Sequence, residues 1–215
     1  MENNTELEVE IPLDSVIHKG NLLIPKAAKG LVIFAHGSGS SRLSPRNQYV
    51  ASVLHNGGIA TLLFDLLTEV EDRVYETRFD INLLTRRLLL ATDWVKQQEM
   101  LKGLSLGFFG ASTGAAAALK AASKQADICA VVSRGGRPDL AGENFPEVSA
   151  ATLLIVGGFD DVVIELNQQA YEKLHCEKSL KIVPGATHLF EEAGTLEQAA
   201  SLANDWFLTN SSKIK

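Results

Sequence analysis

Continuous apolar runs, separated by segments with helical periodicity, organise most of this chain. The runs predict strands buried on both faces, because a strand with one wet face would alternate apolar and polar positions. They lie at residues 31–35, 59–64, 104–109, 128–132, 153–156 and 180–183. Helices are predicted between them, at 45–55, 81–97, 113–124, 164–175 and 196–208. This alternation predicts an α/β fold with a mostly parallel sheet, right-handed crossovers and helices on both faces.

The first part of the chain has a different pattern. Residues 7–11 alternate between apolar and polar, and a second extended run follows at 16–24. This pattern predicts an antiparallel hairpin with one face in water, at one edge of the sheet.

Nothing in the sequence divides the chain into parts. Its 215 residues contain no internal repeat, low-complexity tract or interdomain linker, so we expect a single domain over residues 1–215. The longest irregular stretches, 65–80 and 134–151, are too short to form a separate lid domain. An open active site is therefore expected.

Composition narrows the class of protein. Hydrophobic residues make up 46% of the chain, and no apolar stretch approaches the roughly 18 residues of a membrane helix. A net charge of −6, without a run of lysine or arginine, argues against nucleic acid and anionic membranes as partners. The polar segment 1–6 lacks the pattern of a signal peptide, so a cytoplasmic location is expected. Cys129 and Cys176 lie in unrelated settings and are expected to be reduced thiols.

A glycine–serine motif lies at a predicted junction between strand and helix. Gly110, Ser112 and Gly114 form the pattern G-x-S-x-G, between the strand at 104–109 and the helix at 113–124. This is the pattern of a nucleophile elbow, a sharp and crowded turn that exposes the serine and leaves no room for flanking side chains. Ser112 is therefore the candidate nucleophile.

A serine nucleophile needs a general base, and the base needs a carboxylate that orients it. In open α/β sheets, functional groups collect at the carboxyl ends of the strands. Asp160 follows the strand at 153–156, and His188 follows the strand at 180–183. The order serine, acid, histidine matches one known triad arrangement, so Ser112, Asp160 and His188 are the predicted catalytic triad.

Two other aspartates are candidates for the acid. Asp161 adjoins Asp160, and either of them is suited to cap the helix that follows. Asp139, in the loop after the strand at 128–132, is the third candidate. The histidines on the hairpin, on a mid-chain helix and at a helix end are expected to be surface or packing residues: His18, His55 and His175.

An oxyanion hole requires two backbone N–H groups aimed at the developing negative charge. One is expected from Thr113, directly after the nucleophile. The other is expected from the glycine–serine loop after the strand at 31–35, with Ser38 preferred and Gly39 as the alternative. Alone, this loop also fits a phosphate cradle or a plain turn, although it lacks the G-K-[ST] ending of a P-loop. His36 is expected to fix the loop by hydrogen bonding.

These motifs together resemble the α/β-hydrolase superfamily and, within it, the compact dienelactone hydrolase-like group without a lid. The resemblance covers nearly the whole chain, and its anchors are His36-Gly37, the Gly110 to Gly114 elbow, Gly157-Gly158-Phe159-Asp160 and Gly185-Ala186-Thr187-His188. It implies hydrolysis of a carboxylic ester, lactone or thioester through an acyl-enzyme, without metal or cofactor. Dienelactone hydrolase itself has a cysteine nucleophile, whereas this chain has Ser112, which favours serine esterase chemistry over a lactone-specific assignment.

Four arginines lie on loops near the expected site: Arg42, Arg46, Arg134 and Arg137. A guanidinium group binds a carboxylate or phosphate in bidentate fashion, so Arg134, at the carboxyl end of a strand, is the candidate for holding an anionic substrate. The alternative is an ion pair that braces the loop, with Asp139 or Glu143 as the partner.

The sequence therefore predicts a serine hydrolase that acts on a small ester-type substrate. The same triad serves an acyltransferase or a small peptidase, and a non-catalytic binding module on the hydrolase fold is the alternative from another class. The presence of all three triad residues favours an enzyme over a binding module. Trp206 and Phe207 are expected in the core, with a role in an interface as the alternative.

Overall fold

The computed structural model describes residues 4–143 and 145–211. Residues 1–3 of the polar N-terminal segment, and one residue of the 134–151 stretch, lie outside the described residues. Both cysteines are free thiols, as expected. Within the described ranges, no helix is long and apolar enough to cross a membrane.

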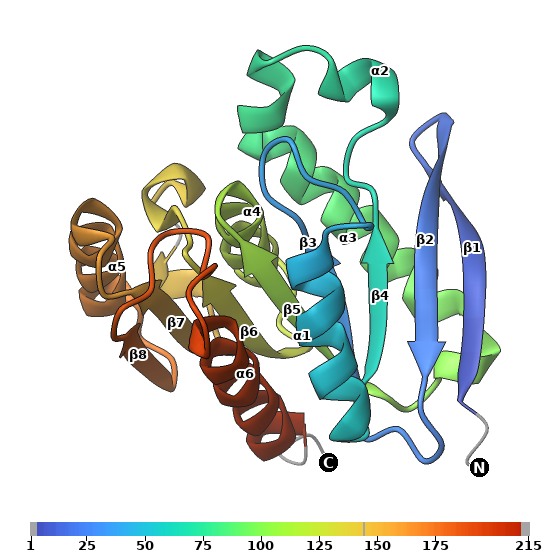
Figure 1. Cartoon of the computed structure of the whole chain (residues 1–215). Helices are drawn as coiled ribbons and strands as arrows, with labels where there is room; N and C mark the ends of the chain where they lie inside the picture. Colours follow the sequence, from blue (N-terminus) through green and yellow to red (C-terminus); the bar gives the residue numbers. More distant parts are fainter. Residues whose placement is uncertain (1–3, 144, 212–215) are drawn as a thin grey trace.

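An eight-stranded sheet runs through the molecule, in the order β1-β2-β4-β3-β5-β6-β7-β8 (Figure 1). The strands are β1 (Thr5–Leu13), β2 (Val16–Ile24), β3 (Gly30–Ala35), β4 (Ala60–Phe64), β5 (Ser105–Ala111), β6 (Ile128–Arg134), β7 (Ala151–Gly157) and β8 (Lys178–Val183). β1 and β2 are antiparallel, β2 is antiparallel to β4, and the other neighbours are parallel. The predicted α/β fold with an N-terminal hairpin at one edge is confirmed.

Helices cover both faces of the sheet. α1 (Pro45–Asn56) and α6 (Thr195–Ser211) lie on one face, whereas α3 (Ile81–Gln97), α4 (Thr113–Ala122) and α5 (Asp161–Lys173) lie on the other (Figure 1). The five predicted helices are confirmed. α5 begins at Asp161, earlier than the predicted residue 164, because the chain turns directly after β7.

The core forms two clusters, one on each face of the sheet. Phe108 and Phe109, adjacent in β5, are both fully buried and belong to different clusters, because successive side chains of a strand point to opposite faces. Phe207 of α6 is fully buried, and Trp206 packs beside it and donates to the carbonyl of Ala151. Both side chains therefore belong to the core, as expected.

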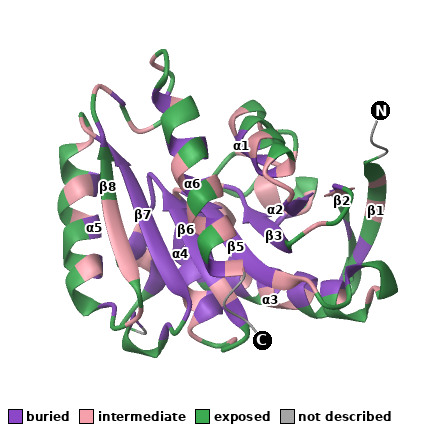
Figure 2. Cartoon of the chain, turned by 90° about the horizontal axis from the view of Figure 1, so that it is seen from below, coloured by how far each residue is buried: buried purple, intermediate pink, exposed green. Residues whose placement is uncertain are grey.

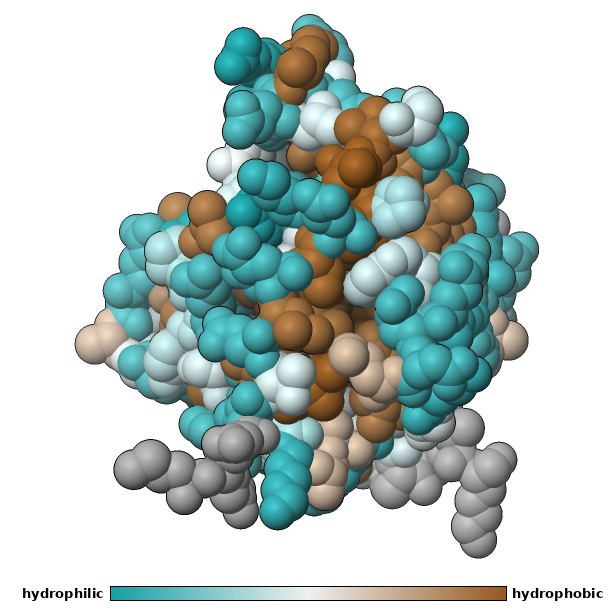
Figure 3. All heavy atoms as spheres, turned by 90° about the vertical axis from the view of Figure 1, so that its right-hand side faces the viewer, coloured by the Kyte–Doolittle hydropathy of each residue, from teal (hydrophilic) through white to brown (hydrophobic). Residues whose placement is uncertain are grey.

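The two edges of the sheet differ from its centre. In β8 only Val183 is buried, so the prediction of burial on both faces is wrong for this run, because β8 is an edge strand (Figure 2). At the other edge, Leu7 and Val9 of β1 are half-buried against the core, while the glutamates that alternate with them are exposed. The face beside β1 accordingly shows apolar side chains bordered by hydrophilic ones (Figure 3).

Short helices interrupt the stretches predicted as irregular. α2 (Glu69–Asp72) and η1 (Glu76–Phe79) lie between β4 and α3, and η3 (Pro138–Ala141) and η4 (Phe145–Glu147) follow β6. A further 3₁₀ turn, η2 (Glu99–Leu101), precedes β5. α2 begins with a capping box, in which Thr68 and Glu71 each accept a hydrogen bond from the other's backbone N–H. None of these elements forms a lid domain.

We predict that Gly114→Ala destabilises the fold by about 3 kcal/mol, at the upper end of overpacking effects. A Cβ at this position would meet the backbone carbonyl oxygens of Ala35 and His36, which cannot move as a side chain could. Gly58→Ala is the control, because Gly58 has a positive φ of 81° but open space around it, and only a backbone cost of about 1 kcal/mol applies. Urea unfolding of both variants checks this, and equal losses would contradict it.

Candidate active site

Ser112 lies on a strained turn between β5 and α4. Its φ and ψ are 51° and −119°, a conformation that costs a non-glycine residue about 1–3 kcal/mol and persists only where its surroundings enforce it. Close backbone packing holds Ser112 in this conformation. A Cβ at Gly110 would meet the backbone of Ala115, and Gly114 packs against β3. The backbone N–H of Ser112 also donates to the carbonyl of Arg134 at 3.2 Å. The predicted strand, turn and helix are therefore present around Ser112.

His188 and Asp160 are brought together by the loops after β8 and β7. Nδ1 of His188 lies 2.7 Å from Oδ2 of Asp160, and the Asp160 carboxylate is mostly shielded from solvent. A carboxylate at this distance fixes the proton on Nδ1 and leaves Nε2 as the free acceptor. Asp160 occupies the N-cap position of α5, but its side chain makes no capping hydrogen bond.

Backbone contacts hold these two loops against each other. The N–H of Phe159 donates to the carbonyl of Ala186 at 2.9 Å, and a Cβ at Gly157 would lie 2.6 Å from the carbonyl oxygen of Thr187. Glu192 accepts hydrogen bonds from both the N–H and the hydroxyl of Thr187, which lower the pKa of the Glu192 carboxyl. The position of His188 therefore follows from main-chain packing more than from its own side-chain contacts.

Ser112 and His188 line one cavity of about 220 Å³. Its wall is completed by residues of the loop after β3, the start of α1 and the end of β6: Gly37, Ser38, Ser40, Ser44, Arg46, Asn47, Ala111, Arg134 and Leu189. In the described part of the chain, the Ser112 hydroxyl makes no direct hydrogen bond to His188. Such bonds are often long in the absence of substrate.

The loop after β3 lies beside Ser112 and is fixed by His36. Nδ1 of His36 donates to the Gly37 carbonyl at 3.0 Å, and the N–H of Leu66 donates to Nε2 at 3.0 Å. This arrangement requires a neutral imidazole, and burial lowers the pKa of His36 accordingly. The predicted loop-fixing role of His36 is confirmed.

The backbone N–H groups of Ser38 and Thr113, the two predicted oxyanion donors, have no backbone acceptor within the described ranges. Ser38 lines the cavity, and Thr113 is the first residue of α4, where an N–H has no intrahelical partner. Gly39, the alternative to Ser38, has a φ of 66° and is not part of the cavity wall. Gly37 approaches Ser112 closely, because a Cβ there would lie 3.2 Å from the Cβ of Ser112.

The two alternative acids, and the histidines expected to be surface or packing residues, lie away from His188. Asp161 is exposed in the first turn of α5, and Asp139 forms an ion pair with Arg137 at 2.7 Å. His18 is buried beside Arg87, and His55 lies 2.6 Å from the hydroxyl of Thr61. Burial lowers the pKa of both histidines, that of His55 to about 4.

Three of the four arginines near the site form ion pairs: Arg42 with Asp65 at 2.6 Å, Arg46 with Glu191 at 3.1 Å, and Arg137 with Asp139 at 2.7 Å. The loop-bracing pair predicted as the alternative for Arg134, with Asp139 or Glu143, is absent from the residues that the structure describes. Asp139 forms its ion pair with Arg137 instead.

Arg134 is a buried cation in the cavity wall. Its side chain is 7% exposed, its Nη2 lies 3.4 Å from Oδ1 of Asn47, and its guanidinium lies over the ring of Phe190 at 5.6 Å. Burial lowers its pKa to about 10, and the charge of Arg46 adds to this effect. Asn47 and Phe190 were not identified from the sequence as neighbours of Arg134. Asn47 is distant from Arg134 in the sequence, and no sequence motif indicates the φ of 56° that brings Phe190 under the guanidinium.

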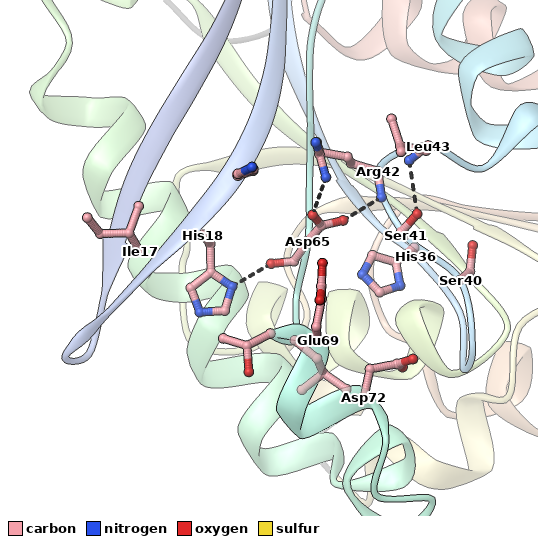
Figure 4. A pocket seen from close by; sticks show the side chains of 13 residues that line it. Ile17, His18, His36, Ser40, Ser41, Arg42, Leu43, Asp65, Glu69 and Asp72 are labelled. Carbon is pink, nitrogen blue, oxygen red and sulfur yellow. Dashed lines mark hydrogen bonds and ion pairs between the residues drawn. The ribbon is translucent and has the colours of Figure 1, made fainter.

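A larger cavity, of about 440 Å³, lies beside the same loop but does not include Ser112 (Figure 4). Arg42 donates to Asp65 from both its backbone N–H and its guanidinium, and Nδ1 of His18 donates to the Asp65 carbonyl at 2.7 Å. Asp72 is paired with Arg78 behind it. Arg42, Asp65 and Asp72 thus already have partners, and the predicted nucleophile and base line the smaller cavity instead.

No group of three or more histidine, cysteine, aspartate or glutamate side chains with metal-binding spacing occurs among residues 4–143 and 145–211. The polar groups at Ser112 are suited to acyl chemistry at a serine.

Comparison with known proteins identifies the family and the fold. Residues 25–210 match the model of the dienelactone hydrolase family. A crystal structure of a dienelactone hydrolase from Anabaena variabilis is 52% identical, with a TM-score of 0.94 over 96% of this chain and 98% of that chain. Est1E from Butyrivibrio proteoclasticus shares the fold, with a TM-score of 0.82 at 16% identity over 96% of this chain and 99% of that chain.

A curated relative from Mycobacterium tuberculosis is 56% identical over 202 residues and carries the provisional name phosphoribosyl transferase. The match covers 94% of this chain but only 46% of the relative, so the chain spans about half the length of that protein.

We predict that the free energy of unfolding falls as the pH drops from about 7 to about 5. Three histidines have lowered pKa values in the folded protein: His18, His36 and His55. Their contribution to the free energy of unfolding is therefore fully present above the pKa of histidine in the unfolded chain, near 6.5. Below that pH the unfolded chain takes up protons that the fold excludes, and stability is lost. Urea unfolding at several pH values checks this, with a shallower slope expected for His55→Gln. A flat profile in the wild type would contradict it.

Proposed function

This chain belongs to the dienelactone hydrolase family, and we propose that it is a serine hydrolase cleaving a carboxylic ester, lactone or thioester of a small substrate through an acyl-enzyme. The observation that carries the proposal is the hydrogen bond of Asp160 to His188, which lines one cavity together with Ser112. The family match supports the hydrolase class. The choice of serine in place of cysteine as nucleophile rests on the residue at position 112.

In the proposed mechanism, the Ser112 hydroxyl attacks the acyl carbonyl and its proton passes to Nε2 of His188. Asp160 holds the imidazole in the required tautomer and stabilises the imidazolium. His188 then returns the proton to the departing alcohol, thiol or ring oxygen as the acyl-enzyme forms. Water, deprotonated by His188, attacks the acyl-enzyme and releases the acid and Ser112.

The proposed oxyanion hole consists of the backbone N–H groups of Ser38 and Thr113. Both lack a backbone acceptor within the described ranges, and Thr113 adds the positive end of α4. Loss of one such donor typically lowers the rate about 10²- to 10³-fold. His36 acts through the loop, because it binds the Gly37 carbonyl and the N–H of Leu66.

Hydrolysis is favoured over the alternatives by the site as a whole. A binding module would not need a strained Ser112 and an oriented His188 in the wall of one cavity. An acyltransferase or a peptidase would use the same groups. The acceptor that reacts fastest with the acyl-enzyme, water or another nucleophile, distinguishes a hydrolase from an acyltransferase. The transferase name of the mycobacterial relative belongs to a protein of which this chain spans less than half.

We predict that Ser112→Ala lowers kcat/KM for p-nitrophenyl acetate by at least about 10⁴-fold, because the acyl-enzyme cannot form. Ser123→Ala, at the other end of α4, is the matched control and should retain wild-type kinetics, since its hydroxyl donates to the Lys120 carbonyl, away from the cavity. A Ser112→Ala variant with half of the activity would contradict the proposal. Adding hydroxylamine or a second alcohol distinguishes hydrolysis from acyl transfer.

We predict that Asp160→Asn lowers kcat about 10³- to 10⁴-fold while the protein remains folded, because the amide no longer fixes the correct tautomer of His188. Asp161→Asn is the matched control, since Asp161 is exposed in the first turn of α5. Steady-state kinetics of both variants check the assignment of the acid. A larger loss for Asp161→Asn than for Asp160→Asn would overturn it.

A further inference from the structure

Arg134 is a cation that the protein buries without a counter-ion. No carboxylate lies within ion-pair distance of it in the described part of the chain, and its Nε is buried without an acceptor. A buried charge without a partner is costly, and proteins seldom retain one that has no use. Arg134 lines the cavity of Ser112, so an anionic group of a bound molecule could supply the missing counter-ion.

The guanidinium of Arg134 is held in place by neutral contacts that leave its charge unsatisfied. The ring of Phe190 lies under it at 5.6 Å, and the Asn47 amide oxygen lies 3.4 Å from Nη2. Phe190 adopts a left-handed backbone conformation directly after His188 and Leu189 to reach this place. The fork of donors is thereby oriented in advance for a planar or tetrahedral anion.

A second cation and a helix terminus face the same cavity. Arg46 lines it, and its only ion pair in the described part of the chain, with Glu191 at 3.1 Å, is with a side chain 63% exposed to solvent. At the start of α1, the Ser44 hydroxyl accepts from the N–H of Asn47 and Pro45 has no N–H, so the Arg46 N–H is left as a free donor. The positive end of the helix dipole adds to both charges.

We propose that this cavity binds a phosphomonoester-type dianion carried by the acyl substrate, held by Arg134, Arg46 and the first turn of α1. A carboxylate carries one negative charge and would neutralise only one of the two arginines. A phosphate monoester has three terminal oxygens and a charge near −2, which match two guanidinium groups and a backbone donor. This inference rests on the proposed hydrolase function for the reacting carbonyl. It deepens that function by giving the substrate class: esters or thioesters with a phosphate at the far end of a short acyl group.

The kinetic test compares three p-nitrophenyl esters of equal chain length. They are 3-phosphonopropionate, the succinate half-ester and valerate, which end in a dianion, a monoanion and a methyl group. The wild type should favour the phosphonate over the valerate by about 100-fold in kcat/KM, with the succinate between them. Arg134→Met should lower this preference at least tenfold, mainly through KM. Equal rates for the three esters, or a preference for succinate over phosphonate, would overturn the proposal.

Arg137→Gln is the control for removing an arginine from this loop, because Arg137 pairs with Asp139 outside the cavity. Its preference among the three esters should equal that of the wild type. If Arg134→Met does not fold, Arg46→Gln at its half-exposed position carries the same test, with a preference lowered about tenfold. An unchanged preference in Arg46→Gln would overturn the role of this second cation.

Thermal unfolding separates this inference from the proposed function. Inorganic phosphate should raise the Tm of both the wild type and Ser112→Ala, but not that of Arg134→Met. Without phosphate, Arg134→Met should have a Tm about 2–4 °C above the wild type, because an uncompensated buried charge is removed. A lower Tm would assign Arg134 a structural role. Phosphate binding without ester hydrolysis would refute only the hydrolase, and hydrolysis without phosphate binding only the anion subsite.

Discussion

The site depends on the close approach of the β5–α4 turn to the end of β3. Gly110 and Gly114 allow backbone to pack on backbone where no Cβ fits, and this contact holds Ser112 at a φ of 51°. The same approach places the loop after β3 beside the serine, with Gly37 close to the Cβ of Ser112. The strain at Ser112 is therefore offset by the packing of two parallel strands and a helix. Any change that separates these elements would move Ser112 and the proposed oxyanion donors together.

The proposed acid and base are positioned by the loops that follow β7 and β8. β7 and β8 are parallel neighbours, so their following loops meet, and Gly157 allows contact with the carbonyls after Gly185. Asp160 and His188 thus face each other across these two loops. This arrangement leaves His188 accessible from the cavity, as a group that exchanges protons with substrate and water must be.

The fold and the candidate residues Ser112, Asp160 and His188 could be predicted, because the sequence patterns that indicate them are local. Buried strands have continuous apolar sequences, and the glycines of a crowded turn occur at fixed positions. The environment of Arg134 depends on contacts distant in sequence. Its nearest groups come from α1 and from the loop after β8, and its predicted partner Asp139 is instead bound by Arg137. The exposure of β8 likewise follows from its position at the sheet edge, which the residues of 180–183 do not reveal.

The central claim is that Ser112 is an activated nucleophile, and the most direct measurement is the intact mass of the protein after exposure to a fluorophosphonate. This reagent phosphonylates serines whose hydroxyl is activated by a neighbouring base. The account predicts one adduct on the wild type and none on Ser112→Ala at the same concentration. An unmodified wild type that is fully folded, or an equal adduct on Ser112→Ala, would contradict it.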